Sequence, residues 1–171
     1  MNQVRELDEI DVRLLELLQD NGRMTSTRLA KNVGLSAPSV LDRIRKLEDR
    51  GVIEGYAALL NPAKVGRSLV AFVLVSLTFH REGSMGEFKE AVRNSPQVLE
   101  CYHVSGEGDF LLKVVVKDID SYRDYLVRDL TRLEVVQRVT TMIVFDTLKH
   151  ETKLEMGNLL EQGHKAAKRS D

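Results

Sequence analysis

The hydrophobic positions between Thr25 and Gly51 recur at the spacing expected of two short helices. A tight turn at Gly34 and Leu35 would join them. Ser36 suits the N-cap of the second helix, where Pro38 follows in the first turn, and Gly51 suits its left-handed stop. The buried faces would be Leu29, Ala30 and Val33 in the first helix, and Val40, Ile44 and Leu47 in the second. This pattern predicts a helix-turn-helix.

Another helix is predicted before this motif, from a cap at Asp8 to about Asp20. Its apolar stripe would pack on the motif and complete a tri-helical head; the stripe is Ile10, Leu14, Leu17 and Leu18. Beyond the motif, residues 52–60 contain β-branched and aromatic positions that suggest short strands, as in a winged helix-turn-helix. Asn61 and Pro62 end this stretch.

The remaining pattern predicts a sheet with two helices. Strands are expected at 69–79, 98–105, 109–117 and 135–149, and helices at 84–94 and from a cap at Asp120. The order β, α, β, β, α, β is that of the ferredoxin-like unit, with both helices on one face of an antiparallel sheet. In the loop between the middle strands, Gly106 and Gly108 permit positive φ. The fold class is therefore α+β.

Such a sheet leaves its other face without helices, and the strands offer that face little polar character. We expect it to meet a second copy of the chain, so that a dimer presents two heads to DNA. The chain divides into a helix-turn-helix domain at 1–60, a linker at 61–67, a βαββαβ domain at 68–149 and a helical or flexible extension at 150–171.

Composition narrows the class of protein further. The 171 residues carry a formal net charge of −1, so affinity for nucleic acid must come from local patches. The single cysteine, Cys101, excludes an intrachain disulfide framework, and a small strand residue is its expected role. Neither a signal peptide nor a run approaching the ~20 apolar residues of a membrane span is found. We expect a soluble, cytoplasmic protein with no membrane partner.

The charge changes sign where the helix-turn-helix begins. Residues 1–22 carry two cations against six carboxylates, whereas residues 23–51 carry seven cations against three carboxylates. The second helix would expose short polar groups at its start and cations further along, namely Ala37, Pro38, Ser39, Asp42, Arg43 and Lys46, with Arg45 beside them. This arrangement is typical of a helix that enters a major groove. A helical pair with a solvated charged face that binds no DNA is the alternative.

No catalytic or metal-binding pattern is found. The sequence contains no paired Cys/His spacing, P-loop or dinucleotide fingerprint, and its four histidines are scattered. His103 is predicted near Asp109, but no nucleophile or oxyanion donor pair can be assigned with it. A strand histidine is its expected role. We expect no enzyme, no metal site and no cofactor.

Four segments together resemble the Lrp/AsnC family of leucine-responsive and asparagine-responsive (feast/famine) regulators: LDEIDVRLLELLQDNGR, LAKNVGLS, VLDRIRKLEDRGVIEGYAALLNP and VSGEGDFLLKV. The resemblance extends over residues 7–149. It implies a transcription regulator with an N-terminal winged helix-turn-helix domain and a C-terminal ferredoxin-like RAM domain. It further implies dimers joined through the C-terminal sheet, assembly into octamers, and an amino acid bound between subunits near the glycine loop.

Carried onto this chain, the resemblance implies a ligand site at Ser105, Gly106, Glu107, Gly108 and Asp109, walled by Tyr102, Val104, Gln137, Thr141, Met142 and Ile143. Backbone amides at glycine turns can receive the ligand's carboxylate. Asp109 or Glu107 would receive its ammonium, although Asp109 could instead be a turn residue. The departure is Gly108, where relatives commonly carry an aromatic residue, and loss of that ring could widen the pocket or relax the loop.

The resemblance also selects the DNA-binding candidates: Thr25, Arg28, Ser36, Pro38, Ser39, Arg43, Arg45 and Lys46. We expect Ser39 and Arg43 to reach base edges, and Thr25, Arg28, Arg45 and Lys46 to hold phosphates. Two alternatives remain, an architectural DNA-binding protein that ignores amino acids and a siroheme-decarboxylase-like enzyme of the same fold. The cations retained on the helix-turn-helix weigh against the enzyme.

Overall fold

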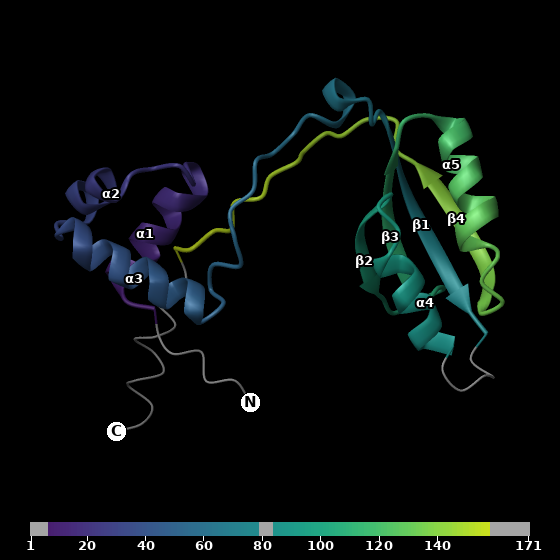
Figure 1. The fold of residues 1–171 in the computed structure, drawn as a ribbon, viewed down its shortest axis with the longest axis horizontal. Helices are drawn as coiled ribbons and strands as arrows, with labels where there is room; N and C mark the ends of the chain where they lie inside the picture. The colour runs from purple at the N-terminus through teal and green to yellow at the C-terminus, as the bar shows by residue number, and fades with distance from the viewer. Residues whose placement is uncertain (1–6, 79–83, 158–171) are drawn as a thin grey trace. The chain divides into compact units, whose positions relative to one another are not determined.

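The computed structural model of the chain describes residues 7–78 and 84–157 (Figure 1). The chain forms two compact units. The first, the head, contains the described residues up to Ala58 together with those from Lys149 onward. The second, the sheet unit, contains the described residues of Leu59–Leu148.

Three capped helices form the head, as predicted: α1 (Glu9–Asp20), α2 (Ser26–Val33) and α3 (Ala37–Asp49). Their N-caps are Asp8, Thr25 and Ser36, and each cap side chain accepts a backbone N–H of the first turn. Gly34 and Gly51 adopt left-handed φ angles of 69° and 67°, which ends α2 and α3 where the sequence indicated. The shared core consists of Leu14, Leu17, Leu29, Ala30 and Val40.

The prediction of short strands at 52–60 is wrong for the single chain. These residues have no regular secondary structure and are not paired into a sheet, and a 3₁₀ turn, η1 (Pro62–Val65), follows them. A strand needs a neighbouring edge to receive its backbone hydrogen bonds. Leu59 and Leu60 remain 71% and 69% exposed, so the apolar pattern that suggested strands does not mark burial within this chain.

The described part of the C-terminal extension, residues 149–157, belongs to the head. The Leu154 N–H donates to Gln19 Oε1 over 2.7 Å, and Gln19 Nε2 donates to the Leu154 carbonyl over 3.2 Å. Lys153 forms an ion pair with Asp20 beside this contact. Residues 149–156 form no helix or strand, whereas a weak helix was one of our two expectations, and residues 158–171 lie outside the described residues.

The sheet unit contains β1 (Leu69–Leu77), α4 (Ser84–Arg93), β2 (Val98–His103), β3 (Phe110–Val116), α5 (Ile119–Tyr125) and β4 (Val136–Ile143), with a π-helical turn η2 (Leu126–Leu130) after α5. Its strands pair antiparallel in the order β2-β3-β1-β4, which confirms the ferredoxin-like prediction. The cap of α5 is Asp118 and not the predicted Asp120, because the carboxylate of Asp118 accepts the Ser121 N–H.

Side chains alternate across β1 and thereby separate the two faces of the sheet. Ala71, Val73, Val75 and Leu77 are buried in a core with residues of both helices, including Phe88 and Tyr122. Residues between them point to the other face, which we call the open face. Strand register places Phe72 of β1 beside Lys113 of β3 and Met142 of β4 there.

The two loop glycines serve different purposes. Gly106 has a φ of 127°, as its predicted freedom allows, but Gly108 does not adopt a positive φ. Gly108 is required for space: a Cβ atom built on it would lie 2.6 Å from Cγ of Leu74 and 2.8 Å from a Leu74 Cδ atom. The Leu74 side chain therefore occupies the position that any larger residue at 108 would need.

We expect Gly108→Ala to lower the free energy of unfolding by about 1–3 kcal/mol, because the added methyl overpacks against Leu74. Leu74→Ala in the same chain should recover part of this loss. Gly86→Ala is the matched control, since a Cβ at that exposed position of α4 meets nothing within 4 Å and should be neutral or stabilising. Denaturant unfolding monitored by circular dichroism measures all four proteins; equal stability of Gly108→Ala and wild type would contradict the packing argument.

Candidate functional site

The N-terminus of α3 presents small polar groups to solvent. The Ser36 hydroxyl accepts the Ser39 N–H over 3.3 Å, and the two serine hydroxyls lie 2.8 Å apart. Pro38 in the first turn keeps the backbone helical where the cap requires it. Ser36, Pro38 and Ser39 are all exposed, so this end of the helix can approach a surface closely.

Cations follow one to two turns later on α3. Arg45 and Lys46 are exposed, and Lys46 Nζ pairs with Asp42 Oδ2 over 2.7 Å. The hydrogen bond from Lys46 lowers the pKa of the Asp42 carboxyl. Because the two side chains are 67% and 59% exposed, water screens this pair, and Lys46 can exchange Asp42 for a phosphate at little cost.

Two further candidates lie on α2. Thr25 caps the helix by accepting the Arg28 N–H over 3.4 Å, and both side chains are exposed. Seven of the eight predicted DNA-binding residues therefore lie exposed on the helix-turn-helix. The exception is Arg43.

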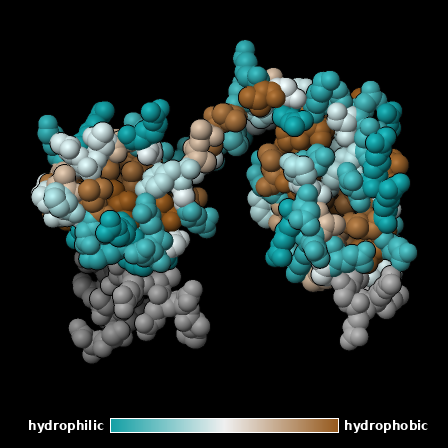
Figure 2. All heavy atoms as spheres, viewed as in Figure 1, coloured by the Kyte–Doolittle hydropathy of each residue, from teal (hydrophilic) through white to brown (hydrophobic). Residues whose placement is uncertain are grey.

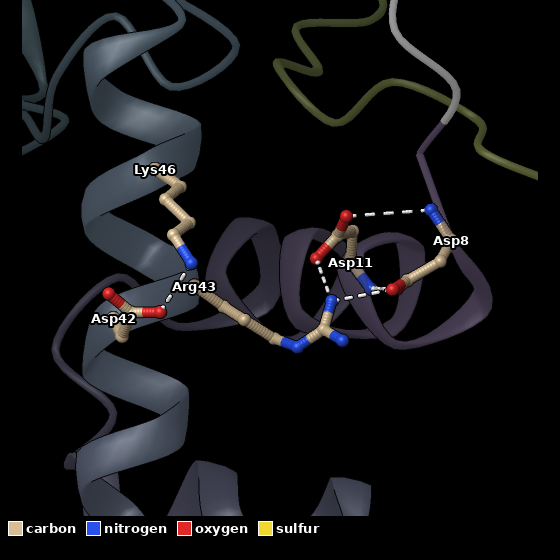
Figure 3. Close-up of polar contacts among 5 residues, drawn as sticks. All are labelled: Asp8, Asp11, Asp42, Arg43 and Lys46. Atoms are coloured by element: carbon tan, nitrogen blue, oxygen red, sulfur yellow. Dashed lines mark hydrogen bonds and ion pairs between the residues drawn. The ribbon is translucent and has the colours of Figure 1, made fainter.

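Arg43 turns away from solvent and toward the N-terminus of α1 (Figure 3). Its Nη1 donates to Asp8 Oδ2 over 2.6 Å and to Asp11 Oδ1 over 2.7 Å. The Arg43 side chain is 30% exposed and that of Asp11 only 12%. We call this cluster of three residues the Arg43 clasp.

The clasp stabilises the charged forms of Asp8 and Arg43. Partial burial opposes ionisation of Asp8, but hydrogen bonds from the Asp11 N–H and from Arg43 outweigh it and lower the Asp8 pKa. Hydrogen bonds to Asp8 and Asp11 raise the pKa of Arg43. A hydrogen bond between charged groups contributes about 1.5–3 kcal/mol, and breaking this one would leave Asp11, only 8% exposed, without its cation.

A pocket of about 550 Å³ is lined by members of both groups. Asp11 and Arg43 of the clasp contribute to its lining, as do the exposed residues Ser39, Asp42 and Lys46 of α3. The clasp and the exposed row of α3 therefore border the same hollow.

Hydrogen bonds to neighbouring strands hold the glycine loop of the sheet unit. The carbonyl of Glu107 accepts Arg138 Nη2 over 3.1 Å and the Ser76 hydroxyl over 3.4 Å. One carboxylate oxygen of Asp109 accepts the Leu77 N–H over 2.7 Å, where the pairing of β1 with β4 shifts register. Asp109 therefore fastens the loop to β1.

The predicted wall residues do not converge on one face within a single chain. Thr141 lies on the helix-covered face, where its hydroxyl is 2.5 Å from that of Tyr122. Met142 lies on the open face beside Phe72. Tyr102 also belongs to the open face, and its hydroxyl donates to Glu100 Oε2 over 2.9 Å. A site that used both Thr141 and Met142 would have to span the sheet.

The structure places other candidate groups in structural roles. His103 stacks on Phe110 with ring centroids 4.9 Å apart, as expected of a strand histidine. Residues 7–78 and 84–157 contain no cluster of three or more His, Cys, Asp or Glu side chains suited to a metal ion. Within those same ranges, every helix is too short or too polar to cross a membrane.

Sequence reasoning missed four partners of the candidate residues. Asp8 was assigned to helix capping alone and Asp11 was only counted among the carboxylates, although their spacing of three places both carboxylates at one helix end. Arg138 of β4 and Ser76 of β1 are register partners, and both contact the Glu107 carbonyl. These contacts depend on the strand register, which cannot be read from the sequence.

Comparisons with known proteins agree on the family. The helix-turn-helix matches the description "Winged helix-turn-helix DNA-binding" over residues 7–54. The sheet unit and the following residues match the "Lrp/AsnC ligand binding domain" over residues 70–154. The first match lies within the head, and the second covers most of the sheet unit and continues into residues 149–154 of the head.

Individual relatives are similar along nearly their whole length. The leucine-responsive regulatory protein of Rhizobium meliloti is 43% identical over 151 residues, covering 88% of this chain and 97% of that protein. That of Escherichia coli K12 is 39% identical over 150 residues, covering 88% and 92%.

Solved structures show the same architecture. A transcriptional regulator from Neisseria meningitidis, determined as a complex with L-methionine, superposes with a TM-score of 0.85 at 35% identity, covering 90% of this chain and 99% of that one. An AsnC family regulator from Agrobacterium tumefaciens gives 0.80 at 35% identity, covering 87% and 97%. With its capped helix-turn-helix and its βαββαβ ligand-binding domain, this chain belongs to the Lrp/AsnC family of transcriptional regulators.

Proposed function

We propose that this regulator binds specific double-stranded DNA sites as a homodimer and that an amino acid bound in the sheet unit changes this binding. The observation that carries the proposal is the exposed row on α3, with small polar groups at the helix start and cations one to two turns later. A recognition helix contacts base edges with its N-terminal residues while its flanks meet phosphates.

The exposed residues divide into two groups by chemistry. Ser36, Pro38 and Ser39 are short enough to let the start of α3 approach base edges. The phosphate contacts fall to Thr25, Arg28, Arg45 and Lys46, which are exposed on α2 and α3. Arg43 could reach a base edge only by leaving two carboxylates.

The open face of the sheet supports the homodimer. Half-buried Phe72 lies at its centre, and Tyr102 and Met142 are 51% and 47% exposed in the single chain. Figure 2 also shows brown, hydrophobic residues outside the two compact units. Leu59 and Leu60 are 71% and 69% exposed. An isologous contact between two open faces would cover such apolar surface and give each dimer two heads.

The glycine loop remains our proposed effector site. The Neisseria meningitidis regulator, similar in fold and sequence, was determined with L-methionine, which supports an amino acid as the ligand class. Because the carboxylate of Asp109 already accepts the Leu77 N–H, Glu107 is the better partner for the ligand's ammonium. Wall residues from both faces of the sheet can act together only if more than one subunit contributes, which agrees with a ligand bound between subunits.

For DNA binding, we expect Arg45→Ala and Lys46→Ala each to lower the affinity for every DNA sequence by a similar factor. Each variant should also reduce the slope of log affinity against log salt concentration by about 1, because it removes a phosphate contact. Ser39→Ala should instead relax base preference within the half-site. Binding isotherms at several salt concentrations and selection from a random DNA pool measure both effects, with Arg93→Ala on α4 as a control that should bind as wild type. Unchanged selection by Ser39→Ala would contradict its assignment to base edges.

Association through the open face predicts that Phe72→Asp yields monomers, because a charge at the centre of an apolar interface cannot be desolvated cheaply. Val127→Asp is the matched control: Val127 is 57% exposed in the π-helical turn η2, away from the open face. Sedimentation equilibrium measures both variants and also reports whether wild-type dimers assemble into octamers. A wild-type protein that is monomeric at all concentrations would refute the homodimer.

For the effector, we expect titration calorimetry with a panel of amino acids to give heat for at least one of them. Glu107→Gln should lose this signal because it removes the proposed ammonium partner, whereas Glu90→Gln on the exposed side of α4 should keep it. Repeating the DNA selection with the active amino acid tests whether binding responds. Silence across the panel would leave a DNA-binding protein without an amino-acid effector.

A further inference from the structure

We propose that Arg43 is a positioning residue of the recognition helix, which fixes α3 on the N-terminus of α1 through Asp8 and Asp11 and does not itself contact bases. The inference rests on the proposed DNA-binding function and assigns a role within it. It also makes two residues of α1, a helix with no proposed DNA contact, determinants of DNA recognition.

Arg43 lies at the border between the buried and exposed rows of α3. It follows buried Val40 by three positions and precedes buried Leu47 by four, but it is also four positions from exposed Ser39. Its long side chain could therefore turn either way. The two hydrogen bonds of 2.6 and 2.7 Å to Asp8 and Asp11 show that it turns toward α1 (Figure 3).

Backbone hydrogen bonds that do not involve Arg43 hold both carboxylates in place. Asp8 Oδ1 accepts the Asp11 N–H over 2.8 Å, and Asp11 Oδ2 accepts the Asp8 N–H over 3.4 Å. Each carboxylate thus uses one oxygen to cap α1 and offers the other to Arg43. A planar guanidinium with fixed donors suits such a pair better than a flexible ammonium does.

Moving the Arg43 side chain from Asp8 and Asp11 to DNA would have an energetic cost that opposes DNA binding. Asp11 is only 8% exposed and would lose the cation that pairs with it, and the carboxylate of Asp8 would lose the same partner. Lys46 pays no comparable penalty, because its partner Asp42 is exposed. The charges therefore favour a bound state in which the clasp stays closed.

The hydrogen bonds of the Arg43 clasp give α3 a defined orientation. Recognition residues must be held within about 0.5 Å and 10–20° of their working geometry. Val40 and Leu47 are buried and hold α3 against the other helices of the head. Their apolar contacts are not directional and do not by themselves set the orientation of α3. Hydrogen bonds from Arg43 to a second helix supply direction at the middle of α3, between Ser39 and Lys46.

The test compares Arg43→Ala, Arg43→Lys, Asp11→Asn and Asp8→Asn, together with the Arg43→Ala/Asp11→Asn double variant, in the full-length protein. Asp8→Asn keeps a good N-cap and removes only the charge, so it remains informative if the buried Asp11→Asn fails to fold. Glu9→Gln is the matched control, because it removes an exposed carboxylate from the same turn of α1 without touching Arg43. Affinities for the selected site and for a scrambled duplex are measured at a temperature where circular dichroism shows each protein folded.

We expect Arg43→Ala and Asp11→Asn to weaken binding to the selected site by about 10- to 150-fold, which corresponds to the loss of one hydrogen bond between charged groups. Asp8→Asn should weaken it by less. Affinity for the scrambled duplex and the salt slope should not change, since no phosphate contact is lost. Base preferences should flatten at all positions of the half-site together, the double variant should bind no more weakly than Arg43→Ala, and Arg43→Lys should lie between Arg43→Ala and wild type.

Two results would overturn the inference while leaving the proposed function intact. If Asp11→Asn binds more tightly and Arg43→Ala loses preference at one base pair only, Arg43 reads a base and the carboxylates restrain it. If all folded clasp variants bind as wild type does, the clasp affects stability alone. Failure of the wild-type protein to select any sequence would refute the proposed function itself.

Discussion

The periodicity of two central elements, α3 and β1, determines which surfaces of this protein remain available for binding. In α3, Val40 and Leu47 are buried, which leaves the side that carries Ser39 and Lys46 in solvent. In β1, burial of Ala71, Val73 and Val75 under two helices turns the alternate residues to the open face. Each functional surface is thus the complement of a hydrophobic row, and shifting either row would abolish both core and surface.

On the head, the availability of a cation for DNA depends on how buried its ion-pair partner is. Lys46 and Arg43 both pair with aspartate, yet one pair is screened by water and the other includes the largely buried Asp11. The same type of ion pair is therefore easily exchanged in one place and structural in the other. Counting cations on a helix face overestimates the number that can meet a phosphate or a base.

In the glycine loop, neighbouring residues have different structural roles. Gly106 supplies a backbone conformation, whereas Gly108 supplies space for Leu74, and Asp109 fastens the loop to the end of β1. Leu74 belongs to the strand whose alternate face is open, so the packing at Gly108 links the loop to that surface.

The sequence by itself determined the helix-turn-helix, its caps at Asp8 and Ser36, the turn at Gly34, the glycine stop at Gly51, and the order βαββαβ. These features depend on contacts between residues a few positions apart, which hydrophobic periodicity and capping chemistry record directly. The short strands expected at 52–60 failed because a strand depends on a partner edge that the single chain does not place beside it. Only the tertiary structure decided that Arg43 meets Asp8 and Asp11, that Thr141 and Met142 face opposite sides of the sheet, and that Leu154 returns to Gln19. Those contacts join residues far apart in the chain, and their geometry follows from packing and register, which no local pattern encodes.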